Sequence, residues 1–154
     1  GTLLERWTAG NYNPVPKARI RARFILTNQG GVPLRWCGMG DQYPTLDAVV
    51  ERIRAGMRLS GAKVTLAACY HPRQEQSPVG KQLALIGQEL FAVPFRVPEG
   101  VIYLSFSPNA RKPSPDGLLW LVRDVPRDSV VFVGDEPSDG ETARRAGVRF
   151  VLIP

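Results

Sequence analysis

The feature that most constrains the fold is an apolar run that stops at an acidic loop near the C-terminal end. Residues 130–133 predict a buried strand, and Asp135 and Asp139 follow it directly. The segment 138–147, "SDGETARRAG", predicts a short helix, and the apolar run 148–153 predicts another strand. Two strands joined by a helix pair in parallel, so this part of the chain indicates an α/β fold.

Local signals mark the two ends of this short helix. Ser138 is a suitable N-cap, Glu141 stands three residues later as in a capping box, and Gly147 suits the position after the last turn. In open α/β sheets, ligands bind beyond the carboxyl ends of the strands. Carboxylates there suit a hard cation such as Mg²⁺. A solvated loop with a helix-capping acid explains the same residues equally well.

The rest of the chain alternates strand and helix patterns. Strands are predicted at 22–27, 63–69 and 101–107, and helices at 43–57, 77–93 and 118–124. Thr45 is the expected N-cap of the helix 43–57. The pattern indicates one domain, residues 1–154, with a mostly parallel sheet covered by helices on both faces. The proline-bearing segment 72–100 is a candidate insertion or lid.

Composition places the chain among ordinary globular proteins and narrows its partners. Of the 154 residues, 44% are hydrophobic and 22% are charged, and no apolar run reaches the length needed to span a membrane. Without a visible leader we expect a cytoplasmic protein with no membrane partner. The two cysteines do not make a disulfide framework. The net charge of +6 favours anionic partners, either phosphorylated metabolites or nucleic acid.

Polar residues follow three of the predicted strands. Thr27 and Asn28 end the first strand, Lys112 lies in the loop after the strand 101–107, and the two aspartates follow the run 130–133. In a parallel sheet these three loops meet at one edge. A hydroxyl, an ammonium and two carboxylates at one edge suit phosphate and a metal ion together.

These segments, in this order, resemble motifs of the haloacid dehalogenase-like (HAD) phosphohydrolases. "ILTNQGGV" resembles the second motif of that superfamily, "RKPSPDGLL" the third and "VFVGDEPSDGETARRAGV" the fourth. The resemblance implies a HAD-like Rossmannoid fold. It assigns phosphate binding and a catalytic role to Thr27 and Lys112, and Mg²⁺ binding to Asp135 and Asp139.

The pairing of "TNQ" with a later "RKP" is similar to one subgroup of that superfamily. The subgroup contains histidinol-phosphate and heptose-bisphosphate phosphatases and polynucleotide 3′-phosphatases. Asn28 and Arg111 join Thr27 and Lys112 as expected substrate-binding residues. Arg111 suits a second anionic group of the substrate, although a solvated arginine explains it equally well.

The resemblance also implies residues that the sequence does not contain. Members begin with a strand that ends in Asp-x-Asp-Gly-Thr, whose first aspartate attacks phosphorus and whose second is the general acid and base. The stretch Gly1-Thr2-Leu3 matches the residues directly after that pair. We therefore expect both aspartates upstream of Gly1, and the first central strand to be missing from this chain.

Cys69 and His71 resemble the first half of the zinc loop of heptose-bisphosphate phosphatases. The second half would need cysteines where this chain has Pro108 and Ala110. Structural zinc takes about four ligands in a closed site, so we do not expect zinc here.

The resemblance therefore implies a Mg²⁺-dependent phosphomonoester hydrolase that works through an aspartyl-phosphate. Its substrate is a sugar phosphate or a nucleic-acid 3′-phosphate, and the chain without the upstream aspartates should be inactive. The alternative is a noncatalytic pseudo-phosphatase that binds a phosphate-bearing partner or another protein.

Overall fold

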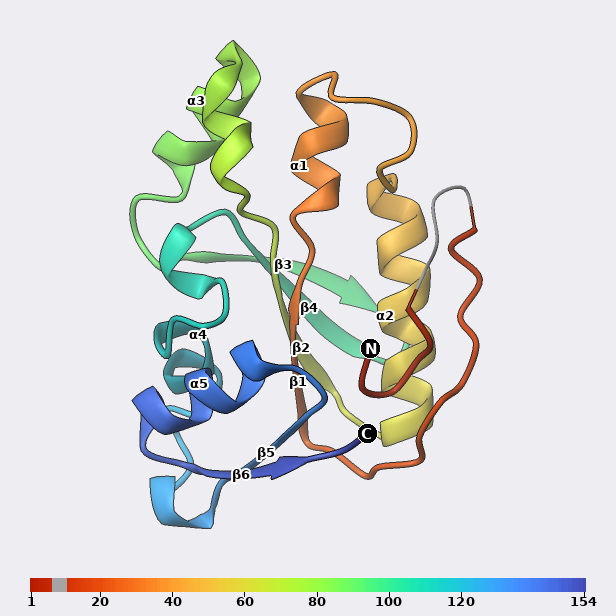
Figure 1. Ribbon diagram of the computed structural model, residues 1–154, viewed down its shortest axis with the longest axis vertical. Coiled ribbons are helices and arrows are strands. Elements are labelled where there is room, and N and C mark those ends of the chain that lie inside the picture. The colour runs from red at the N-terminus through yellow and green to blue at the C-terminus, as the bar shows by residue number, and fades with distance from the viewer. Residues whose placement is uncertain (7–10) are drawn as a thin grey trace.

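A computed structural model describes residues 1–6 and 11–154 and contains two sheets (Figure 1). The larger sheet has the strand order β1 (Phe24–Asn28), β2 (Val64–Ala68), β4 (Gly100–Ser105) and β3 (Ala92–Val97). Its first three strands are parallel, and β3 is antiparallel to β4. The smaller sheet pairs β5 (Val131–Gly134) with β6 (Arg149–Leu152) in parallel.

Among the described residues, five α-helices connect these strands: α1 (Gly31–Trp36), α2 (Leu46–Ser60), α3 (Pro78–Ile86), α4 (Asp116–Leu121) and α5 (Pro137–Ala146). Short 3₁₀ turns lie at Pro72–Gln76, Pro108–Ala110 and Arg127–Ser129. The Thr45 side chain caps α2 by accepting a hydrogen bond from the Ala48 amide, as the sequence predicts. In the described part of the chain, no helix is long and apolar enough to cross a membrane.

Helices cover both faces of the larger sheet, and the mixed α/β fold with a mostly parallel sheet is confirmed. Alternate residues of β2 point to opposite faces. Ala67 packs into a core with residues of α2 and α3, whereas Leu66 packs into a second core with residues of α4 and α5. Figure 1 shows α2 on one side of β1 and α4 and α5 on the other.

One predicted helix is too long. The segment 77–93 is helical only to Ile86, and β3 begins at Ala92. The sequence "AVPFRV" has the period of a strand, and Pro94 is tolerated because β3 lies at the edge of the sheet, where a missing N–H is harmless. Part of the segment 72–100 thus belongs to the main sheet. Its role as a lid stays a prediction.

The two sheets are separate, and a gap lies between β1 and β5. Each of these strands ends its sheet, and a cavity of about 390 Å³ lies between them. Residues 20–26 and 129–133 line this cavity, and its further lining from α4 is apolar. Strand edges carry unpaired N–H and C=O groups. The gap is therefore bordered by the edge strands of the two sheets.

Candidate functional site

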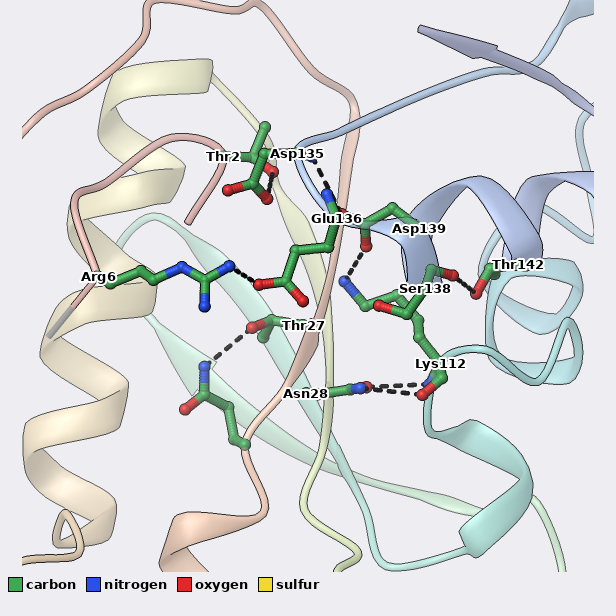
Figure 2. A network of polar contacts seen from close by, with 11 residues as sticks. Thr2, Arg6, Thr27, Asn28, Lys112, Asp135, Glu136, Ser138, Asp139 and Thr142 are labelled. Carbon is green, nitrogen blue, oxygen red and sulfur yellow. Dashed lines mark hydrogen bonds and ion pairs between the residues drawn. The ribbon is translucent and has the colours of Figure 1, made fainter. Parts of the chain in front are cut away.

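The last residue of β1 is hydrogen-bonded to the loop that follows β4 (Figure 2). The Asn28 side chain bonds both main-chain groups of Lys112: its Oδ1 accepts from the Lys112 amide at 3.0 Å, and its Nδ2 donates to the Lys112 carbonyl at 3.2 Å. Beside it, the Thr27 hydroxyl oxygen accepts a hydrogen bond of 2.9 Å from the Gln29 side chain. Asn28 thus fixes the position from which the Lys112 side chain extends.

The Lys112 ammonium reaches the loop after β5. It donates to Asp139 Oδ1 at 2.6 Å, and both side chains are largely buried, with 14% and 4% of their surfaces exposed. The other oxygen of Asp139 accepts from the amides of Asp135 and Glu136, each at 3.1 Å. Asp139 therefore holds the lysine and the start of α5 at the same time.

The start of α5 differs from the sequence prediction. Glu136, not Ser138, is the N-cap, and Asp139 is its capping-box partner. Pro137 takes the first helical position, where its missing N–H costs no hydrogen bond. This places the helix start two residues earlier than predicted. The predicted end is confirmed, because Gly147 has the left-handed conformation that ends α5.

Asp135 faces a different set of donors from Asp139. Its Oδ1 accepts from the Thr2 hydroxyl at 3.1 Å, and Lys17 Nζ lies 3.5 Å from its Oδ2. Burial opposes ionisation, but the Thr2 hydrogen bond and the positive charges of the Gly1 amino group and Lys17 together lower the pKa of Asp135. Asp135 is therefore an ionised carboxylate at neutral pH.

Two N-terminal stretches, within residues 1–6 and 11–17, lie beside each other next to this cavity edge. Leu4 and Pro16 form an antiparallel bridge. Arg52 of α2 donates to the Glu5 carbonyl at 2.9 Å and to the Asn13 carbonyl at 3.2 Å. Arg6 makes an ion pair with Glu136 (Figure 2). The sequence analysis did not identify these contacts, because each joins residues far apart in the chain.

These groups surround a cavity of about 270 Å³. All three predicted loops contribute to it, through Thr27, Asn28, Lys112, Asp135 and Asp139. The structure thus brings these residues together, while their roles in binding and catalysis stay predictions. It adds residues that the sequence analysis missed, namely Thr2, Gln29, Arg52, Glu136 and Ser138.

Arg111 lies apart from this group. Arg111 is not among the described residues that line the cavity, although its neighbour Lys112 is. The charge of Arg111 instead acts on Tyr70 and His71. Burial and the charges of Arg111 and Arg73 lower the pKa of His71, so this histidine is neutral at neutral pH.

The described residues do not complete a magnesium site. Across residues 1–6 and 11–154, no group of three or more His, Cys, Asp and Glu side chains is arranged to hold a metal ion. Both oxygens of Asp139 already accept hydrogen bonds, and Asp135 has Lys17 beside it. A Mg²⁺ ion takes near-octahedral oxygen coordination. Asp135 alone would therefore supply only a fraction of the ligands that a Mg²⁺ ion needs.

The side chains of Cys69 and His71 have structural roles in the fold. The Cys69 side chain is buried, and burial raises the pKa of its thiol to about 12. His71 caps a 3₁₀ turn, where its Nδ1 accepts from the Arg73 amide at 3.1 Å.

Comparison with known proteins bears on the C-terminal part of the chain. Residues 99–153, which include Lys112, Asp135 and Asp139, match the family described as haloacid dehalogenase-like hydrolases. This match supports the HAD-like hydrolase superfamily. No curated protein and no solved structure matches the chain. The HAD-like match agrees with the fold and supports a phosphatase-type hydrolase in general.

Proposed function

We propose that this domain is the phosphoryl-binding part of a HAD-type phosphomonoesterase. The observation that carries the proposal is the fixed position of Lys112, whose main chain is held by Asn28 and whose ammonium is held by Asp139. A cation fixed in a partly buried cavity needs no reorganisation to meet the charge that develops on a phosphoryl group. Thr27 lies at the same edge and offers a hydroxyl to a phosphoryl oxygen.

We place the nucleophile on a strand that occupies the gap between β1 and β5. That strand would end at the same edge as its neighbours, and an Asp-x-Asp sequence at its end would lie beside Thr27 and Lys112. The first aspartate would attack phosphorus, and the second would protonate the leaving oxygen. Mg²⁺ dependence belongs to the same proposal, with Asp135 as one ligand. The substrate is a sugar phosphate or a nucleic-acid 3′-phosphate.

The test adds the proposed strand. The chain is extended upstream of Gly1 by an apolar strand that ends in Asp-x-Asp, and hydrolysis of p-nitrophenyl phosphate is measured with Mg²⁺. We expect turnover that disappears when the first aspartate is changed to Asn. Lys112→Met should lower kcat about 10²- to 10³-fold, because a preorganised charge is lost. Lys81→Met, an exposed lysine on α3, serves as the control.

Two results would contradict this proposal. One is a folded, extended protein without measurable turnover. The other is full activity in Lys112→Met, since the fixed ammonium is the observation from which the proposal starts.

A noncatalytic phosphate-binding module is the second candidate. It is favoured by the engagement of the carboxylates, because both oxygens of Asp139 accept hydrogen bonds and Asp135 lies beside Thr2 and Lys17. The codons upstream of Gly1 discriminate between the two candidates. An Asp-x-Asp sequence there supports the enzyme, and a start site directly before Gly1 supports the binding module.

A further inference from the structure

One basic side chain in the lining of the site cavity has no acidic partner among the described residues. Five lining side chains are charged: Arg52, Lys112, Asp135, Glu136 and Asp139. Each acid has a basic partner, since Lys112 pairs with Asp139, Lys17 with Asp135 and Arg6 with Glu136. Within the described ranges, no acidic side chain forms an ion pair with Arg52.

Arg52 is held in place without being neutralised. Its guanidinium donates through Nη1 and Nη2 to the carbonyls of Asn13 and Glu5. A guanidinium has five N–H donors, so these two bonds leave donors for another acceptor. Burial lowers the pKa of Arg52, which reflects the loss of solvent around the charge. An anion in the cavity would stabilise the charge of Arg52 in place of the solvent that burial removes.

Arg52 and Lys112 reach the cavity from different elements. Arg52 comes from α2, whereas Lys112 is bound to Asp139 at the start of α5, and these helices flank β1 on its two sides (Figure 1). A ligand between them meets two separate cations. A phosphoryl group bound by Lys112 and Thr27 would leave Arg52, on α2, free to meet another part of the same molecule.

We infer that Arg52 binds a second anionic group, carried on the leaving-group side of the substrate. This inference rests on the proposed function and narrows its substrate to phosphomonoesters that bear another phosphate or carboxylate. Arginine suits this task because its planar donors match both oxyanions in a bidentate manner.

Arg52 also joins α2 to the N-terminal segment, so a purely structural role has to be distinguished. A structural arginine affects every ligand of the cavity in the same way. A substrate-binding arginine affects only ligands that carry the second anion. The ratio of two dissociation constants separates these roles, because it does not depend on the fraction of protein that is folded.

The experiment measures binding to the chain as it stands, by isothermal titration calorimetry or NMR titration. Glycerol 3-phosphate and 3-phosphoglycerate form a matched pair, since a carboxylate in the second replaces a hydroxymethyl group in the first. Inorganic phosphate reports the phosphoryl subsite alone. A dinucleotide with a 3′-phosphate tests whether an internal phosphodiester serves as the second anion.

We expect the unmodified chain to bind 3-phosphoglycerate about tenfold more tightly than glycerol 3-phosphate, the worth of one charge-assisted hydrogen bond. Arg52→Gln should bring this ratio close to one and leave affinity for glycerol 3-phosphate within about twofold. Arg52→Lys should keep part of the preference. Arg58→Gln is the matched control on the same helix, because Arg58 pairs with Glu99 instead of facing the cavity.

The outcomes separate this inference from the proposed function. A ratio near one in the unmodified chain overturns the inference whether or not any variant folds. An equal loss for both ligands in Arg52→Gln assigns Arg52 a structural role and also overturns it. In both cases, the proposed function still stands if the unmodified chain binds inorganic phosphate and Lys112→Met weakens that binding. Failure of the unmodified chain to bind inorganic phosphate contradicts the proposed function itself.

Discussion

The buried pair of Lys112 and Asp139 should contribute measurably to the stability of the fold. The pair is short, at 2.6 Å, and both side chains are largely buried. Asp139→Ala removes the partner of a buried ammonium, which costs about 3–5 kcal/mol for fully buried pairs. It also removes the capping contact at the start of α5, worth about 1 kcal/mol. Since Lys112 keeps some exposure, we expect a total loss of about 4 kcal/mol.

Lys112→Met should cost less. It leaves Asp139 with two amide donors, from Asp135 and Glu136, so the remaining carboxylate is still hydrogen-bonded. We expect a loss of about 2 kcal/mol, in the range for a hydrogen bond between charged groups. Asp139→Asn should lie between the two single variants, because the amide oxygen can keep one capping bond while the charge is lost.

The double variant decides whether the two residues act as a pair. With both charges removed, no ion remains unpaired, and the loss should be about 2 kcal/mol smaller than the sum of the single losses. Urea unfolding at neutral pH, followed by circular dichroism and tryptophan fluorescence, measures each free energy of unfolding. Losses that add to within about 0.5 kcal/mol would refute the reasoning, because they would show that the contact carries no coupling.

Two further predictions concern positions away from the site. Hydrogen bonds from Arg54 and Arg58 lower the pKa of Glu99 to about 2 against the effect of burial. The ionised Glu99 therefore contributes its full stabilisation above the pKa that this carboxyl has in the unfolded chain, and the contribution is lost as the pH falls toward 2. Glu99→Gln should therefore reduce stability at neutral pH and flatten its decline in acid-titration melts, and an unchanged pH profile would contradict this. Gly80→Ala should destabilise far more than Gly61→Ala in urea unfolding. An added Cβ at Gly80 would lie 0.9 Å from the Gln74 carbonyl oxygen, whereas Gly61 has open space and only the left-handed backbone penalty of about 1 kcal/mol. Equal losses would count against the packing described here.

The parts of the fold that the sequence predicts are those encoded by short-range patterns. Thr45 caps α2 because its hydroxyl reaches an amide three residues away, and Gly147 ends α5 because it adopts a left-handed conformation at little cost. The meeting of three loops at one edge also follows from local patterns, since parallel strands place their carboxyl ends together.

The start of α5 shows where local signals compete. Glu136, Ser138 and Asp139 are all polar residues that can cap a helix, and the sequence alone does not rank them. Pro137 favours the first helical position and so selects Glu136 as the N-cap. This choice leaves Asp139 at the third helical position, where it bonds two amides and faces Lys112.

Arg52 and Lys17 were missed for a different reason. Neither lies in a motif, and each acts through partners that tertiary structure brings close: Arg52 bonds carbonyls of the N-terminal segment, and Lys17 reaches Asp135. A cation in a sequence has no mark that distinguishes a cavity-lining side chain from a solvated one. Only the pairing of charges around the cavity separates them.

The gap between the sheets and the site cavity are linked through shared residues. Both are lined by Thr2, Leu3, Ile25, Leu26, Lys112 and Asp139. A strand that entered the gap would pair with β1 and β5 along its length and would reach Lys112 at its end. The element that joins the two sheets would then also deliver its last residues to the site that we propose binds the phosphoryl group. Stability and activity should therefore rise together when such a strand is supplied, because the same contacts serve both.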